Sequence, residues 1–201
     1  MKTILNAFAA AALLACATAS AGVLTTTLHV DNGFVAYLST SDSEVGTAFA
    51  SGNNWGHGYI NTVELEKGKD YYLHISAYDE GGIAGFLGQF SLDGGSHRFA
   101  NGFQTLVTNT TDWKGNNTGF DGNYGALGNL GWNGAGPWGV QWDTSWDATW
   151  IWAGDAEWND NAYFTTKITA LEQANDVPEP GSVALLGLGL AGLGMMRRRK
   201  A

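Results

Sequence analysis

Cysteine and basic side chains are scarce in this sequence, and each shortage limits what the protein can be. The only cysteine is Cys16, so the chain can form no internal disulfide and no cysteine-based metal site. Region 22–177 holds five basic and 18 acidic residues, a net charge of −13. Such a domain lacks the basic surface that nucleic-acid binding requires, which excludes that class of partner. The acidic charge either keeps the domain soluble or attracts cations.

Motifs that identify common enzyme classes are also missing. The sequence has no G-x-S-x-G nucleophile motif, and its four histidines, His29, His57, His74 and His97, do not form an H-E-x-x-H pattern. His29 and His74 fall in predicted strands, which favours structural roles. His57 lies in a glycine-flanked loop and is the one histidine worth testing. We therefore expect no catalytic residues and no enzymatic activity.

The N-terminus has the order of a secretory signal peptide. A lysine near the start precedes an apolar stretch at 4–15, and the small residues Ala19 and Ala21 then form a cleavage site. We predict a signal peptide over 1–21 and a mature chain without cysteine. One alternative is open, because Leu-Leu-Ala-Cys at 13–16 resembles a lipoprotein processing box in which Cys16 carries the lipid.

The C-terminus combines three signals in a fixed order. A Val177-Pro178-Glu179-Pro180 motif comes first, an apolar run over 182–196 follows, and a basic cluster closes the chain: Arg197, Arg198, Arg199 and Lys200. A spanning helix needs about 20 apolar residues, so this run is a short transmembrane helix, extended by arginine side chains that reach the interface. Basic residues favour the cytoplasmic side, which predicts that the chain before the motif faces outward.

This three-part tail resembles the PEP-CTERM sorting signals of Gram-negative bacteria. The resemblance implies processing by an exosortase, a membrane enzyme that recognises the Pro-Glu-Pro motif at 178–180. It also implies an exported precursor, anchored in the inner membrane and then passed to the cell surface or extracellular matrix. We take 177–201 as the sorting signal and 171–176 as a linker.

The remaining region, 22–170, is predicted to be one all-β domain. Apolar and polar residues alternate with period two, as half-buried strands require, at 71–78 and 86–92. The other predicted strands are 24–30, 34–38, 63–65, 105–108, 148–152 and 162–168. Glycine-containing turns at 31–33, 67–69, 80–82 and 93–95 separate them. Short strands at this spacing predict an antiparallel β-sandwich or jelly roll.

Several short elements of this region resemble galactose-binding-like jelly-roll domains, which accompany many bacterial glycoside hydrolases. They are Asp-Asn-Gly-Phe at 31–34, Leu-x-x-Gly-x-x-Tyr at 65–71, Asp-x-Gly-Gly-x-x-Gly-Phe at 79–86 and Gly-Pro-Trp-Gly at 136–139. The resemblance implies a jelly-roll fold over about 24–168. It also implies either sugar binding or support of a catalytic partner.

Tryptophan is concentrated in one segment. Seven of the nine tryptophans fall within 132–158, among glycine and asparagine, so we expect an ordered irregular loop packed over one side of the sandwich. Aromatic faces and nearby carboxylates are what glycan binding uses. The candidate ligand-binding residues are Trp132, Trp138, Trp142, Trp146 and Asp143. The alternative is that these tryptophans are core, which we expect for Trp150 and Trp152.

Calcium is the one cofactor that the sequence allows. Asp31-Asn32-Gly33 or the pair Asp121 and Asn123 could supply oxygen ligands, although asparagine and aspartate at turns explain the same residues. We otherwise expect no cofactor and no metal.

These features predict an exported, non-enzymatic surface or matrix protein, structural or glycan-associated. Its expected partners are an exosortase and extracellular polysaccharide or matrix proteins. One alternative is a carbohydrate-binding module that uses the tryptophan-rich loop. Another is a polysaccharide hydrolase, which would need two carboxylates about 5–10 Å apart in a cleft.

Overall fold

The structure is a computed structural model that describes residues 22–171 and Gly187. The predicted signal peptide with Ala19, Ala21 and Cys16, the sorting motif at 177–180 and the basic cluster at 197–200 lie outside the described residues. The predicted transmembrane segment at 182–196 lies outside them too, apart from Gly187. In the part that is described, no helix has the length and apolar character that crossing a membrane requires.

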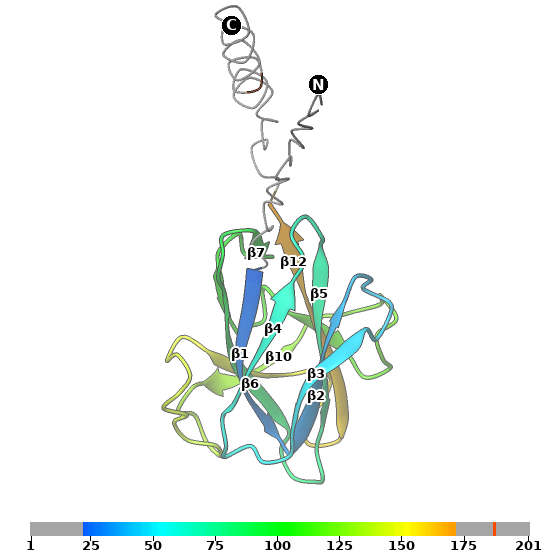
Figure 1. Cartoon of the computed structure of the whole chain (residues 1–201). Coiled ribbons are helices and arrows are strands. Elements are labelled where there is room, and N and C mark those ends of the chain that lie inside the picture. The colour runs from blue at the N-terminus through cyan, green and yellow to red at the C-terminus, as the bar shows by residue number, and fades with distance from the viewer. Residues whose placement is uncertain (1–21, 172–186, 188–201) are drawn as a thin grey trace, which may run out of the picture.

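Two antiparallel six-stranded sheets pack face to face, which confirms the predicted all-β sandwich (Figure 1). The first sheet has the order β10-β11-β6-β1-β4, with β8 paired to β6, and the second has the order β3-β2-β5-β12-β7, with β9 paired to β12. The strands are β1 (Gly22–Asp31), β2 (Gly33–Ser39), β3 (Thr47–Gly52), β4 (Tyr59–Leu65), β5 (Tyr71–Tyr78), β6 (Gly85–Leu92), β7 (His97–Phe99), β8 (Thr105–Val107), β9 (Lys114–Asn116), β10 (Gly128–Trp132), β11 (Thr149–Trp152) and β12 (Asn161–Ala170).

The main core lies between the sheets and follows the predicted alternation. In β5, the four residues on the predicted inner face, Tyr71, Leu73, Ile75 and Ala77, are all buried there. In β6, Phe86 and Phe90 point inward, and their rings meet those of Trp113 and Phe164. The period-two pattern therefore fixed the inner face of both strands.

The sequence did not predict four of the strands: β3, β7, β9 and β10. β3 consists mainly of small residues and is paired only with β2 at a sheet edge, so its two faces differ little in burial. β10 reads Gly-Asn-Leu-Gly-Trp and its register shifts between Asn129 and Gly131. Neither sequence has a period-two signal, because a strand with one exposed edge needs little apolar alternation.

The predicted glycine turns connect the two sheets. The step from Asp31 to Gly33 carries the chain from β1 in the first sheet to β2 in the second. Gly81 and Gly82, between β5 and β6, have φ angles of 117° and 108°, a region that side chains disfavour. These glycines are therefore required by the backbone at the crossing between sheets.

Both ends of the described domain lie at one pole of the sandwich, where β1 begins and β12 ends (Figure 1). The amide of Val23 donates to the carboxylate of Asp93 at 2.7 Å, and the amide of Leu171 donates to the carbonyl of Ser96 at 2.8 Å. One turn between β6 and β7 thus holds both ends.

A second, smaller core lies on the outer face of the first sheet. There the loop over 133–148 covers Leu87 of β6 and packs Trp138 against Trp150, with ring centroids 4.3 Å apart and an angle of 20°. This cover explains why His29 of β1 is buried although it points away from the main core. The tryptophan-rich loop is ordered over one side of the sandwich, as its aromatic content predicted.

His74 of β5 makes the domain sensitive to acid. Its ring is fully buried and stacks on Phe120 with centroids 4.2 Å apart, while Nε2 lies 3.7 Å from Oδ1 of Asp42. Burial lowers the pKa of His74, and the charge of Asp42 offsets this only in part.

Because the folded state binds this proton more weakly, His74 contributes stability that is present above a pH of about 6.5 and is lost as the pH falls. We expect His74→Gln to flatten the dependence of unfolding free energy on pH between 7 and 5, by at most about 1.4 kcal/mol per pH unit. Urea unfolding at several pH values measures both slopes. Parallel curves would contradict this role.

Candidate aromatic binding site

Three tryptophans form an exposed aromatic group, which we call the tryptophan platform: Trp132 at the end of β10, and Trp142 and Trp146 in the loop. Their exposed fractions are 56%, 84% and 53%. The rings of Trp132 and Trp146 are nearly parallel, with centroids 5.8 Å apart and an angle of 27°. The ring of Trp142 stands at 82° to that of Trp146, also at 5.8 Å. Three large rings held together at the surface give an apolar face with defined orientation.

Trp138 does not belong to the platform, and its assignment as a candidate ligand-binding residue is wrong. It is only 4% exposed, its ring is stacked on Trp150, and its indole nitrogen donates to Oδ2 of Asp31 at 2.8 Å. Trp150 and Trp152 are fully buried, as expected of core residues. They occupy different cores, however, since Trp152 packs on Phe164 between the sheets.

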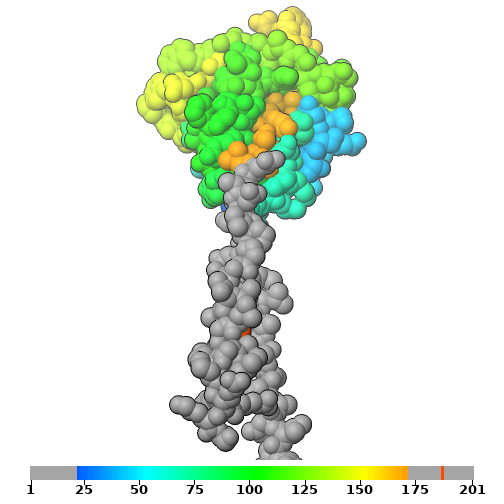
Figure 2. Space-filling view, turned by 90° about the horizontal axis from the view of Figure 1, so that it is seen from above, coloured from blue at the N-terminus to red at the C-terminus, as the bar shows by residue number. Residues whose placement is uncertain are grey.

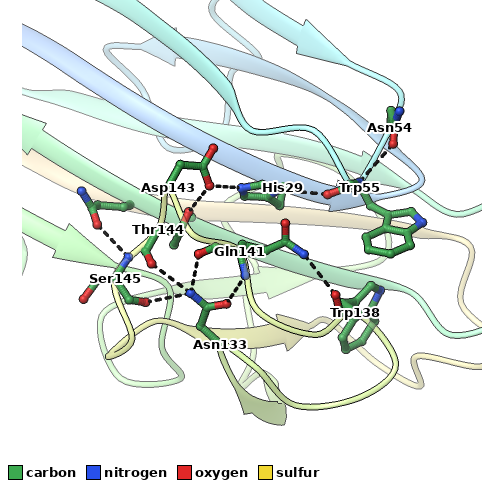
Figure 3. A network of polar contacts seen from close by, with 12 residues as sticks. His29, Asn54, Trp55, Asn133, Trp138, Gln141, Asp143, Thr144 and Ser145 are labelled. Atoms are coloured by element: carbon green, nitrogen blue, oxygen red, sulfur yellow. Dashed lines mark hydrogen bonds and ion pairs between the residues drawn. The ribbon is translucent and has the colours of Figure 1, made fainter.

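One buried side chain, Asn133, organises the loop that carries the platform (Figure 3). Its Nδ2 donates to the carbonyls of Gln141 and Thr144, each at 2.9 Å, and lies 3.3 Å from that of Ser145. Its Oδ1 accepts from the amide of Gln141 at 2.8 Å. A fully buried amide that satisfies this many backbone groups fixes the loop conformation.

Besides the bond from Trp138 to Asp31, two polar contacts attach the loop to strands of the first sheet. The amide of Ser145 donates to Oε1 of Gln89 in β6 at 2.8 Å. His29 in β1 lies 2.7 Å from Oδ1 of Asp143 through its Nε2. Ser145 and Asp143 flank the platform residues in sequence, so the two contacts hold the platform directly on β1 and β6.

The His29 contact places a proton between the strand and the loop (Figure 3). Nδ1 of His29 lies 2.9 Å from the carbonyl of Trp55, which can only accept a hydrogen bond, so Nδ1 is a donor. Nε2 then either donates to ionised Asp143 or accepts from its protonated form, and both arrangements hold one proton between these two atoms. The candidate ligand residue Asp143 is therefore occupied by His29, and it positions the loop.

A groove of about 470 Å³ opens beside the platform, on β6 and β8. Ser145 and Asp147, the two neighbours of Trp146, form one side of it. Amide side chains from Gln89, Asn101 and Asn109 line it. In Figure 2 the yellow surface of the loop lies beside the green surface of the β6 to β8 region. Aromatic faces and hydrogen-bonding groups thus meet at one surface.

The remaining predicted residues lie away from this site or are engaged with the protein. The ring of His57 meets that of Tyr59 at 4.8 Å, edge to face. Asn32 Oδ1 accepts from the amide of Glu80, and Asp121 Oδ1 accepts from Asn116 and from the amide of Asn123. Residues 22–171 contain no group of three or more histidine, cysteine or acidic residues arranged to hold a metal ion. Calcium binding at the two turns stays a prediction.

Sequence reasoning missed the residues that support the platform. Gln89 gave no signal, Asn133 counted only as a polar loop residue available for hydrogen bonds to a sugar, and His29 was interpreted only as a structural strand residue. The adjacency of Asn133 to Trp132 was visible, but nothing local distinguishes a buried asparagine from the many exposed ones in this loop.

Comparison with known proteins identifies the tail. Residues 176–200 match the PEP-CTERM protein-sorting motif, which confirms the C-terminal signal and implies an exported protein that an exosortase processes and sorts to the cell surface. No curated protein and no solved structure matches the chain.

Proposed function

We propose that this exported protein is a non-enzymatic component of the cell surface or extracellular matrix that binds polysaccharide through its tryptophan platform. The observation that carries the proposal is the joint exposure of Trp132, Trp142 and Trp146. The hydrophobic effect favours burying such rings, so a group of them left at the surface indicates a binding site. The proposed likeness to galactose-binding-like domains agrees with this role.

The chemistry of the site supports a sugar ligand. A pyranose ring has one face of C–H groups and an equatorial rim of hydroxyls, so it pairs with an aromatic face and with hydrogen-bonding groups beside it. The platform supplies the rings, and the adjoining groove supplies Ser145, Asp147 and several amides. The rigid support of the loop by Asn133 limits the entropy lost on binding.

The proposal also states that the protein does not hydrolyse the polysaccharide that it binds. A glycosidase places its general acid in a water-poor environment, opposite a second carboxylate. Two carboxylates, Asp112 and Asp147, do line the groove, but Asp147 is exposed and Asp112 accepts a hydrogen bond from Asn109 at 2.9 Å. Prolonged incubation with polysaccharide should therefore release no new reducing ends. Release that Asp112→Asn abolishes would instead establish a hydrolase.

Removing a platform ring should weaken polysaccharide binding. We expect Trp142→Ala to lower the affinity of the exported, purified protein for polysaccharide from the producing cells by about 3–10-fold, the effect of losing one aromatic contact. Trp158→Ala is the matched control, because Trp158 is 79% exposed on the loop between β11 and β12. Calorimetric titration measures both affinities.

The control decides the interpretation. Equal affinities for both variants and the parent would show that the platform makes no contact with polysaccharide. A loss in both would indicate a general effect of surface tryptophans. Thermal unfolding of each variant should match the parent, since both side chains are exposed.

A further inference from the structure

We infer that the ligand is a linear polysaccharide with free amino groups, which runs from the tryptophan platform into the groove on β6 and β8. This inference rests on the proposed polysaccharide binding and adds the shape and charge of the chain that is bound. Three features carry it: the course of the groove, the aromatic side chain beyond the platform, and the charge of the groove walls.

The groove is lined by Gln89 to Ser91 of β6 and by the paired residues Thr105 to Val107 of β8. Its platform end is marked by Gln89, which holds Ser145, and its other end by Ser91, which pairs with Thr105 of β8. Phe103, just before β8, lines the groove and is 68% exposed. Two strand steps of about 3.4 Å separate Gln89 from Ser91, and the side chain of Phe103 extends the surface further. A single sugar ring would leave part of this surface empty, whereas a chain covers it.

The walls of the groove carry negative charge only. Asp112 and Asp147 line it, and none of the described lysine, arginine or histidine residues does. No described residue donates a hydrogen bond to the carboxylate of Asp147, whereas Asp143 nearby is occupied by His29. Asp147, which follows Trp146 in the sequence, thus presents an exposed carboxylate to the groove.

This charge selects among polysaccharides. The domain around the groove is itself strongly acidic, so chains of uronic acids are repelled at a distance and at the site. An ammonium group on a sugar ring would be attracted by Asp147 and by the face of a neighbouring tryptophan. The acidic groove and the aromatic platform therefore favour the same ligand, a chain of amino sugars that are not fully acetylated.

Three hexasaccharides of similar length test the inference: a glucosamine hexamer, an N-acetylglucosamine hexamer and a uronic acid hexamer. The first two differ only in the acetyl groups that remove the charge. With the exported, purified protein at low salt, we expect the glucosamine hexamer to bind about tenfold more tightly than the acetylated hexamer. The difference should shrink at high salt, because exposed charges are screened. The uronic acid hexamer should bind least.

Variants locate the effect. Asp147→Asn should reduce the preference for glucosamine about threefold, while Asp160→Asn, which removes an equal charge from an exposed position between β11 and β12, should leave it unchanged. If the bound chain reaches Phe103, Phe103→Ala should lower the affinity for the glucosamine hexamer about 3–10-fold. The affinity for a glucosamine disaccharide should not change.

Failure of the inference and failure of the proposed function give different results. Equal binding of the two glucosamine-based hexamers, tighter binding of the uronic acid hexamer, or binding of cell polysaccharide alone would overturn the inference and leave polysaccharide binding intact. Loss of all binding, including that of cell polysaccharide, would overturn both.

Discussion

Replacing Asn133 with alanine should collapse the tryptophan platform while the sandwich stays folded. The substitution removes the donor to the carbonyls of Gln141 and Thr144 and the acceptor for the amide of Gln141, all inside the loop. Buried groups left without partners cost about 1–3 kcal/mol each, so we expect the free energy of unfolding to fall by about 3 kcal/mol. For a domain of this size the melting temperature should fall by about 6–12 °C.

Polysaccharide affinity should fall at least tenfold in the same variant, because Trp142 and Trp146 lose their fixed positions. Asn133→Asp tests the donor alone. It keeps the accepting oxygen and replaces the donor nitrogen with a second oxygen that faces the carbonyls. Asn129→Ala is the control, because Asn129 is exposed and bonds only to the nearby amide of Gly131. An Asn133→Ala protein with parental stability and affinity would show that the loop needs no internal support.

A methyl group at Gly58 should break the contact between His29 and the loop. A Cβ atom there would lie 1.7 Å from Oδ2 of Asp143 and 3.1 Å from Nε2 of His29, far inside contact distance. Gly58→Ala must therefore displace Asp143 and leave a nitrogen of the buried His29 without a partner. We expect a loss of about 2–3 kcal/mol in the free energy of unfolding and weaker polysaccharide binding.

Gly56→Ala is the matched control for this experiment. A Cβ atom at Gly56 would meet only Oδ1 of Asn54, at an ordinary 3.5 Å. Proton NMR can follow the hydrogen held between Nε2 of His29 and Oδ1 of Asp143: its signal should be protected from exchange in the parent and in Gly56→Ala, and lost in Gly58→Ala. A protected signal in Gly58→Ala would mean that Asp143 does not approach the glycine as closely as described.

Eight of the twelve strands and the main core were predictable because they obey a local rule. Alternation in β5 and β6 assigned each residue to a face, and the faces were correct even for Leu87, whose side is covered by the loop. Tryptophan burial did not follow from such a rule. Trp138 and Trp142 are four residues apart in similar surroundings, yet one is buried and the other is 84% exposed.

The residues that support the platform could not be predicted from the sequence for a related reason. His29 and Asp143 are 114 residues apart, and Gln89 is 56 residues from Ser145. Their contacts exist only because β1 and β6 are neighbours in the sheet and the loop folds back over them. Composition predicted an aromatic surface, for which we propose sugar binding, but only the three-dimensional arrangement separates its rings from the residues that hold them.

The position of the two ends of the described domain has a consequence for the proposed groove. The turn that holds Val23 and Leu171 lies where β1 starts, whereas His29, the anchor of the platform, lies seven residues further, roughly 24 Å along the strand. The proposed groove spans much of this distance, because Gln89 lies opposite Thr27 of β1 and Ser91 lies opposite Thr25. A polysaccharide that filled the groove would therefore extend from the platform toward the turn that holds both ends of the described domain.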